Sequence, residues 1–353
     1  MVIRDRLERG DILYDLDLMP GARNAVTTCL GLKRGERLTM VTDVATAEIA
    51  ASLLTVARQI GAIVECFVLE EEGKRPLDRC PPRILGAAIE SDAIICCIQP
   101  QEGEIRSRGE LIDLVERQRI RYAHMVWITP TIMRQAMRAD YQAVDRLSNW
   151  VLDRVRGAER VVVRSPAGTD IEATFRRDHL WIKTSGLISP MYWSNLPGGE
   201  VWSVPDDVKG VFVVDGTIGD YLCRKYREIS ATPLVLEIED GVLRAAHCKN
   251  AALQREFFDY CHAETNSDRV GEFAFGTNIA IAQMIGNLLQ DEKIPGVHIA
   301  FGNPLPSLTG ATWACATHID AISRSTDVWA NGTQIMGNGH YLTEAETPLS
   351  TAG

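Results

Sequence analysis

The hydrophobic pattern before residue 157 alternates between short apolar runs and longer segments with helical spacing. Apolar runs typical of buried strands cover residues 37–43, 62–69, 92–98 and 122–128. Segments with helical spacing lie between and after them, at residues 45–60, 81–90, 109–118 and 130–155. Strands that alternate with helices in this way favour a parallel sheet with helices on both faces.

The pattern changes after Gly157. Short β-rich runs separated by glycine-bearing turns occur at residues 160–164, 170–175, 210–214, 234–239 and 297–301. Only two helices are predicted in this part, at residues 251–265 and 279–289. We therefore expect an α/β fold class. An N-terminal parallel-sheet α/β domain at 1–157 precedes a mixed α+β, strand-rich domain at 158–353.

Composition limits the class of protein. The chain has 353 residues, of which 46% are hydrophobic and 24% charged, as in an ordinary globular protein of two domains. A net charge of −10 argues against nucleic acid or an anionic membrane surface as a partner. Nine cysteines without a Cys-x-x-Cys pair favour reduced core thiols. No signal-peptide pattern and no apolar run of about 18 residues is found, so we expect a cytoplasmic protein.

Residues able to bind a metal ion cluster in the C-terminal half. His318 and Asp320 are the most specific pair, because residues i and i+2 of a strand point to the same face. Glu200 follows a Pro-Gly-Gly turn, Glu272 lies among apolar neighbours, and His298 lies in an apolar strand. Taken singly, each has a structural alternative: an exposed glutamate, a glutamate on the wet face of a strand, or a hydrogen-bonded core histidine.

Three carboxylates and two imidazoles form a ligand set that suits Zn²⁺, Mn²⁺, Fe²⁺ or Co²⁺. Five ligands exceed the three that one catalytic zinc commonly uses, which indicates a two-metal site. The run from Asp291 through Glu292 to Lys293 is expected to be a solvated turn, although Lys293 could instead contact a substrate carboxylate or an oxyanion. The chain has no Gly-x-Ser-x-Gly nucleophile motif, no His-Glu-x-x-His zinc helix and no nucleotide-binding fingerprint.

Four segments in order carry a resemblance to a known family. They are Asn-Leu-Pro-Gly-Gly-Glu at 195–200, Gly-Glu-Phe-Ala-Phe-Gly-Thr-Asn at 271–278, the segment from Asp291 to Gly302, and His-Ile-Asp at 318–320. The series resembles the aminopeptidase T-like metallopeptidase family. The chain departs from the peptidase pattern at Leu305, where a tyrosine is expected, and at Gly199, where a second acidic residue is expected.

This resemblance implies a homodimeric hydrolase that cleaves an amide or peptide-type bond in a small-molecule or short-peptide substrate. It also implies a dinuclear centre with Zn, Mn or Co held by Glu200, Glu272, His298, His318 and Asp320. A metal-activated water would be the nucleophile, and Glu200 or Glu272 would accept its proton.

Two alternatives remain open from the sequence. The 2,5-dihydroxypyridine 5,6-dioxygenases belong to the same superfamily and hold one Fe²⁺ by two histidines and an aspartate. The corresponding hypothesis is that this chain is a ring-cleaving dioxygenase for hydroxylated aromatic or heteroaromatic compounds, with His298, His318 and Asp320 around Fe(II). The other alternative is a binding protein that has kept the fold and lost turnover.

Overall fold

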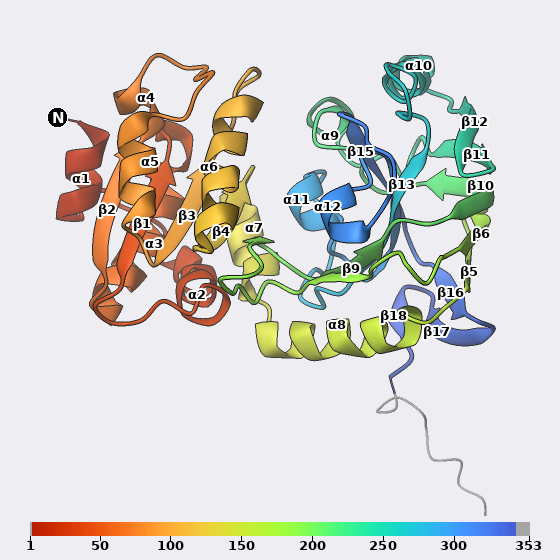
Figure 1. The fold of residues 1–353 in the computed structure, drawn as a ribbon, viewed down its shortest axis with the longest axis horizontal. Coiled ribbons are helices and arrows are strands. Elements are labelled where there is room, and N and C mark those ends of the chain that lie inside the picture. Colours follow the sequence, from red (N-terminus) through yellow and green to blue (C-terminus); the bar gives the residue numbers. More distant parts are fainter. Residues whose placement is uncertain (1, 344–353) are drawn as a thin grey trace, which may run out of the picture. The chain divides into compact units, whose positions relative to one another are not determined.

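The apolar runs of the N-terminal half form a parallel sheet in a computed structural model that describes residues 2–343 (Figure 1). The strand order is β2-β1-β3-β4-β8, and each neighbouring pair is parallel. The strands are β1 (Arg37–Thr42), β2 (Ile63–Val68), β3 (Ala93–Ile98), β4 (Arg121–Val126) and the short β8 (Ser194–Asn195). Strand β3 is buried along its whole length, as expected for a central strand covered on both faces.

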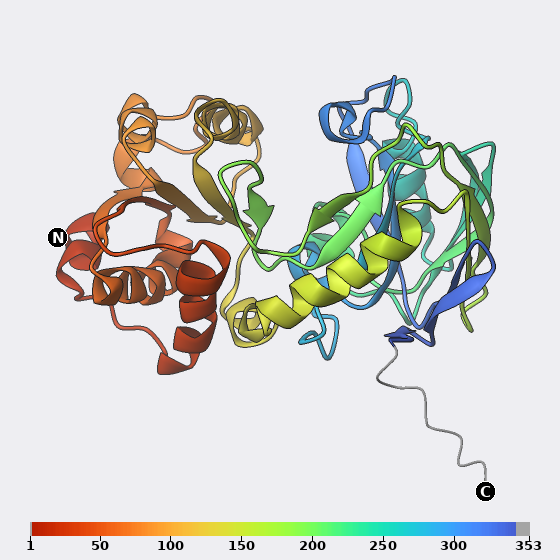
Figure 2. The same ribbon diagram turned by 60° about the horizontal axis from the view of Figure 1, so that its bottom comes forward.

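Helices cover both faces of this sheet (Figure 2). Helices α5 (Pro82–Ile89) and α6 (Ile105–Gln118) pack on the face that carries Ile94, Cys96 and Ile98. Helix α3 (Ala47–Ile60) packs against β1 and β2. Further helical segments that the sequence pattern did not predict include α1 (Ile3–Arg9), α2 (Met19–Arg23) with the π-helical turn Asn24–Cys29 that follows it, and α4 (Leu69–Glu72).

The single helix predicted at 130–155 is wrong. The structure has α7 (Pro130–Arg134), a 3-10 turn at Ala136–Arg138 and then α8 (Tyr141–Val155). The side chain of Asp140 accepts hydrogen bonds from the backbone N–H groups of Gln142 and Ala143, at 3.0 and 3.1 Å. An aspartate in this position starts a new helix, so the local cap outweighs the continuous apolar periodicity.

The chain divides into two compact units. The first comprises Met1–Asp145 and Thr184–Gly198, and the second comprises Arg146–Lys183 and Gly199–Gly353. The parallel sheet is the centre of the first unit, whereas the second unit is strand-rich. The expected α/β class, with a parallel-sheet region followed by a strand-rich α+β region, is confirmed.

Two antiparallel sheets form the second unit. The larger has the order β12-β11-β10-β6-β5-β16-β17-β18. Its strands are β5 (Arg160–Arg164), β6 (Asp170–Thr174), β10 (Asp207–Val214), β11 (Leu234–Glu239), β12 (Val242–His247), β16 (Asp327–Ala330), β17 (Thr333–Gly337) and β18 (His340–Tyr341). The smaller has the order β15-β14-β13-β9-β7. Its strands are β7 (Ile182–Thr184), β9 (Glu200–Ser203), β13 (Val270–Gly276), β14 (Gly296–Gly302) and β15 (His318–Ser323).

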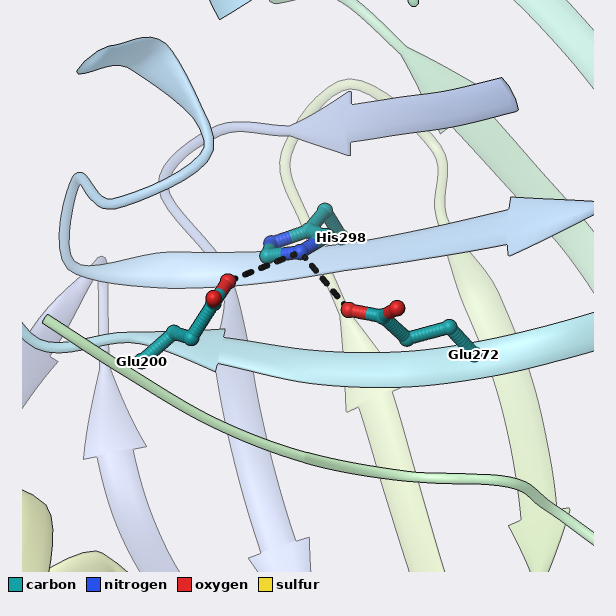
Figure 3. Close-up of side chains that lie close together, drawn as sticks. All are labelled: Glu200, Glu272 and His298. Carbon is teal, nitrogen blue, oxygen red and sulfur yellow. Dashed lines mark ion pairs between the residues drawn. The ribbon is translucent and has the colours of Figure 1, made fainter. Parts of the chain in front are cut away.

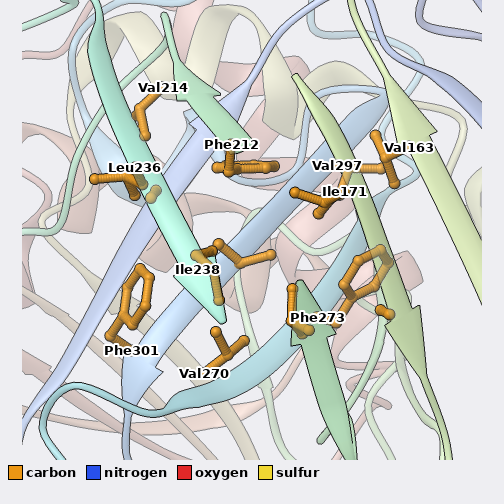
Figure 4. Packing of buried hydrophobic residues seen from close by; sticks show 14 of the residues in the cluster. Val163, Ile171, Phe212, Val214, Leu236, Ile238, Val270, Phe273, Val297 and Phe301 are labelled. Carbon is orange, nitrogen blue, oxygen red and sulfur yellow. The ribbon is translucent and has the colours of Figure 1, made fainter. Parts of the chain in front are cut away.

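The core of the second unit lies between these sheets (Figure 4). Ile171, Phe212 and Leu236 of the larger sheet pack in one cluster with Phe273 and Phe301 of the smaller. Alternate residues on the strands of the smaller sheet therefore point into this core, and the residues between them point to the opposite face of the sheet.

Short helices complete the second unit: α9 (Leu222–Tyr226), α10 (Ala251–Tyr260), α11 (Leu288–Asp291) and α12 (Pro306–Thr309). The helix predicted at 279–289 is wrong, because only α11 forms there. The buried carboxylate of Asp291 accepts hydrogen bonds from the backbone N–H groups of Ile285, Gly286 and Asn287. These bonds fix a turn where the periodicity favours a helix.

The nine cysteines are all free, as expected. Within residues 2–343, no helix is both long and apolar enough to cross a membrane.

Candidate metal centre

The strand register places the five candidate ligands on one face of the smaller sheet. Asp320 pairs with Ala300, and Ala300 also pairs with Glu272. His298 is two residues before Ala300, and His318 is two residues before Asp320, so these side chains share that face. Glu200 pairs with Gly276, which lies four residues after Glu272 on the same strand, so Glu200 and Glu272 point to the same face. Four adjacent strands therefore contribute ligands to one face, opposite the apolar core.

The side chains approach one another in a continuous series. His298 Nε2 lies 3.5 Å from Glu272 Oε1 and 3.8 Å from Glu200 Oε2 (Figure 3). His318 Nε2 lies 3.7 Å from Glu272 Oε2 and 3.5 Å from Asp320 Oδ1. Glu272 thus faces one histidine with each of its carboxylate oxygens, and all five candidate residues are joined through these contacts.

Burial and unsatisfied polarity make this cluster suitable for a cation. Glu200, Glu272 and Asp320 are only 6–7% exposed. The His298 Nε2 atom is buried and has no hydrogen-bond partner among the described residues. Burying several carboxylates beside an imidazole nitrogen that has no hydrogen-bond partner is costly, and a metal ion removes that cost. The residues present therefore fit a divalent metal ion.

The protein groups alone attract positive charge at this site. Burial lowers the pKa of His318, but the Asp320 and Glu272 carboxylates outweigh burial and raise this pKa to about 10. The pKa of His298 is also raised, because Glu272, Asp320 and Glu200 together overcome its burial. Burial raises the pKa of Asp320, yet the neighbouring His318 brings it below its usual value.

Two residues beside the candidate ligands were not predicted to belong to their cluster. Glu292 and Lys293 were expected in a solvated turn, which is wrong: Lys293 is 1% exposed and the preceding Asp291 is fully buried. Glu292, His298 and Asp320 form one compact group of potential metal ligands. Glu200, Glu272 and His298 form a second. The only local signal was three charged residues directly before a buried apolar strand.

Glu292 and Lys293 form a charged pair beside the candidate ligands. The Lys293 ammonium lies 2.6 Å from Glu200 and 2.6 Å from Glu292. Burial raises the pKa of Glu292 to about 8. Burial lowers the pKa of Lys293, but the carboxylates of Glu200 and Glu292 reverse this and keep it above its usual value.

Gly199 is a glycine for steric reasons. Its φ is +125°, and a Cβ atom would lie 2.8 Å from the Cβ atom of Asn278. An acidic side chain cannot be added at this position without displacing the Asn278 segment. The departure from the peptidase pattern at Gly199 therefore follows from the close approach of these two segments.

A buried set of carboxylates and imidazoles on a strand-rich scaffold is the kind of site that metal-dependent hydrolases use. The chain belongs to the thermophilic metalloprotease (M29) family, whose sequence profile matches residues 138–319, just over half of the chain. It is therefore a metallopeptidase by family, and the family implies the use of a divalent metal. No curated protein matches the chain in sequence.

Two solved structures share the fold over nearly the whole chain. Wild-type AmpT from Thermus thermophilus has a TM-score of 0.68 and 17% identity, and the match covers 93% of this chain and 99% of that chain. The 2,5-dihydroxypyridine dioxygenase from Pseudomonas putida KT2440 has a TM-score of 0.67 and 14% identity, with 92% and 97% covered. At these identities the matches show the fold. The family profile and the AmpT fold together confirm the resemblance to the aminopeptidase T-like family.

Proposed function

We propose that this chain hydrolyses a peptide or related amide bond in a short substrate, with a metal-activated water as the nucleophile. The observation that carries the proposal is the series of contacts that joins Glu200, Glu272, His298, His318 and Asp320, in which the buried His298 Nε2 atom has no hydrogen-bond partner among the described residues. The family of the chain supports a peptide substrate.

Glu200, Glu272, His298, His318 and Asp320 would hold the metal, for which Zn²⁺, Mn²⁺ and Co²⁺ are suitable. When bound, the metal polarises the scissile carbonyl and lowers the pKa of a water molecule. Glu272 directs both of its oxygens at histidines, so we assign it to holding the metal. Glu200 keeps one oxygen against Lys293 and turns the other toward His298, and we propose it as the acceptor of the water proton.

The carboxylate count favours hydrolysis over ring cleavage by Fe(II). A mononuclear oxygenase centre uses two histidines and one carboxylate and leaves positions open for substrate and O₂. Here two additional carboxylates, Glu200 and Glu272, lie within 3.8 Å of His298 Nε2 and crowd those positions. Full activity under strict anaerobiosis is expected, and a requirement for O₂ would instead support the dioxygenase.

His318→Ala and Asp320→Ala variants test the assignment. Each removes a ligand from the same strand, so we expect loss of bound metal and of peptide hydrolysis with the first unit still folded. Metal content, hydrolysis of a short-peptide panel and circular dichroism are the measurements. His247→Ala is the control, because His247 is 61% exposed and pairs with Glu237 on the larger sheet, away from the candidate ligands. Wild-type activity in either ligand variant would refute the assignment.

A further inference from the structure

Lys293 is a buried lysine whose ammonium group lies among the candidate metal ligands. Its Nζ atom is 2.6 Å from Glu200 Oε1 and 2.6 Å from Glu292 Oε1, and its side chain is 1% exposed. An ammonium group is strongly hydrated, and lysine is almost never buried in this way unless it is paired. The two carboxylates replace its water, so Lys293 is a component of the centre.

The backbone around Lys293 is held in place by hydrogen bonds. Its N–H donates to the carbonyl of Gln290 at 2.9 Å, and its carbonyl accepts from the N–H of Asn278 at 2.9 Å. The adjacent Asp291 carboxylate accepts the hydroxyl of Thr217 at 2.6 Å in addition to three backbone N–H groups. The ammonium therefore enters the centre from a well-anchored turn.

Two compact groups of potential ligands meet at one imidazole. One consists of Glu200, Glu272 and His298, and the other of Glu292, His298 and Asp320. The His298 Nε2 atom faces Glu200 and Glu272 of the first group, and its single lone pair binds one cation at a time. Lys293 joins a carboxylate of the first group, Glu200, to a carboxylate of the second, Glu292.

We propose that Lys293 takes the place of a second metal ion, so that this centre binds one divalent ion firmly. The inference rests on the proposed function and refines the two-ion expectation from the sequence. In a two-metal site a shared carboxylate gives one oxygen to each cation. Glu200 divides its oxygens in this way, with Oε1 on the ammonium and Oε2 toward His298. A second divalent ion would have to lie close to a buried ammonium, where like charges repel strongly.

Zinc stoichiometry tests the inference without an activity assay. Bound metal is removed from the full chain with a chelator, and the protein is then loaded with excess zinc chloride. Unbound zinc is removed by gel filtration, and the zinc content per chain is measured by inductively coupled plasma mass spectrometry. We expect about one zinc per chain in the wild type and about two in Lys293→Met, because the apolar side chain frees Glu200 and Glu292 for a second ion. Lys293→Arg keeps a positive charge and should remain at about one ion per chain.

Lys209→Met is the matched control, because Lys209 is 59% exposed and pairs with Glu172 away from the centre. It should bind the same amount of zinc as the wild type. About two zinc ions in the wild type, or an unchanged count in a folded Lys293→Met variant, would overturn the inference and leave the proposed function intact. Absence of zinc from the wild type would overturn both.

Zinc anomalous diffraction from wild-type crystals decides the matter even where Lys293→Met fails to fold. We expect one anomalous peak at the centre and the Lys293 ammonium still on Glu200 and Glu292. A second peak that contacts both of these carboxylates would show that a metal ion, and not the lysine, holds them together.

Discussion

Each of the two units contains a buried cluster of carboxylates, and the clusters differ in how their oxygens are satisfied. In the first unit, Arg75 binds Asp43, Glu70 and Glu104 next to the end of strand β1. Both oxygens of Glu104 accept two hydrogen bonds each, one from Arg75 and one from a backbone N–H group, that of Leu77 or Gln101. This cluster is complete, so it needs no external cation.

The cluster of the second unit is bound differently. The ion pairs of its four carboxylates, from Glu200, Glu272, Glu292 and Asp320, run to one ammonium group and two imidazoles. One of these imidazole nitrogens, His298 Nε2, has no hydrogen-bond partner among the described residues. The comparison indicates that a buried acidic cluster is a candidate metal site where it contains such an unpartnered nitrogen. The parallel-sheet unit therefore has a structural ion-pair network, and the strand-rich unit has the candidate centre.

Substituting one glutamate of each cluster by glutamine should separate these roles. We expect Glu272→Gln to lower the rate of peptide hydrolysis by about a thousandfold, because the two oxygens of Glu272 face both histidines. This is the upper end of the effect seen when one transition-state interaction is lost. The unfolding free energy of Glu272→Gln should change less than that of the matched variant in the first unit, because the lost attraction to the two histidines is offset by the loss of repulsion among the carboxylates. Activity, metal content and urea unfolding are the measurements.

Glu104→Gln is the matched variant in the first unit. It should keep hydrolysis per folded molecule and lose at least about 2 kcal/mol of stability, because an amide nitrogen would face donors that now bind a carboxylate. If Glu104→Gln impaired catalysis as strongly as Glu272→Gln, the distinction between a structural and a functional cluster would fail.

Removal of Arg75 should be the largest purely structural effect. Arg75→Met leaves Asp43 and Glu104 buried without their counter-charge, and breaking a buried pair typically costs about 3–5 kcal/mol. The control is Arg79→Met, because Arg79 is 65% exposed where it pairs with Glu110, and such surface pairs contribute about 1 kcal/mol or less. Denaturant midpoints measure both. Similar losses in the two variants would contradict the assignment of Arg75 as the central residue of the network.

The local pattern of apolar and polar residues was sufficient to predict those parts of the fold in which side chains alternate between the two faces of a strand. The continuous apolar run around Ile95 predicted a buried strand of a parallel sheet, and the His318 and Asp320 spacing predicted two side chains on one face. The same pattern gave wrong predictions where a residue distant in the sequence determines the local structure. The segment at 279–289 has helical spacing, but Asp291 binds its N–H groups and is itself held by Thr217. Lys293 was expected to be solvated because its partner Glu200, on strand β9, is distant in the sequence.

Histidines of the two units extend the comparison to protonation. His124, on β4, donates one hydrogen bond from Nδ1 to Asn195 Oδ1 at 2.8 Å, and its other ring nitrogen has no partner among the described residues. In this it is like His298, but no carboxylate forms an ion pair with it within the described part of the chain. Burial lowers the pKa of His124 to about 4, whereas the pKa of His318 is raised. An unsatisfied imidazole nitrogen therefore indicates a metal ligand only together with nearby carboxylates.

The lowered pKa of His124 predicts a loss of stability in acid. Below pH 6.5 the unfolded chain binds a proton at this histidine, whereas the folded chain does so only near pH 4. The unfolded state thus binds more protons between these values, and stability falls by up to roughly 3 kcal/mol as the pH decreases through this window. In His124→Gln this dependence should be absent, so the difference in unfolding free energy between wild type and variant should shrink from pH 7 to pH 4. The exposed His340→Gln variant should follow the wild type, and a His124→Gln curve parallel to the wild-type curve would contradict the burial of a neutral imidazole.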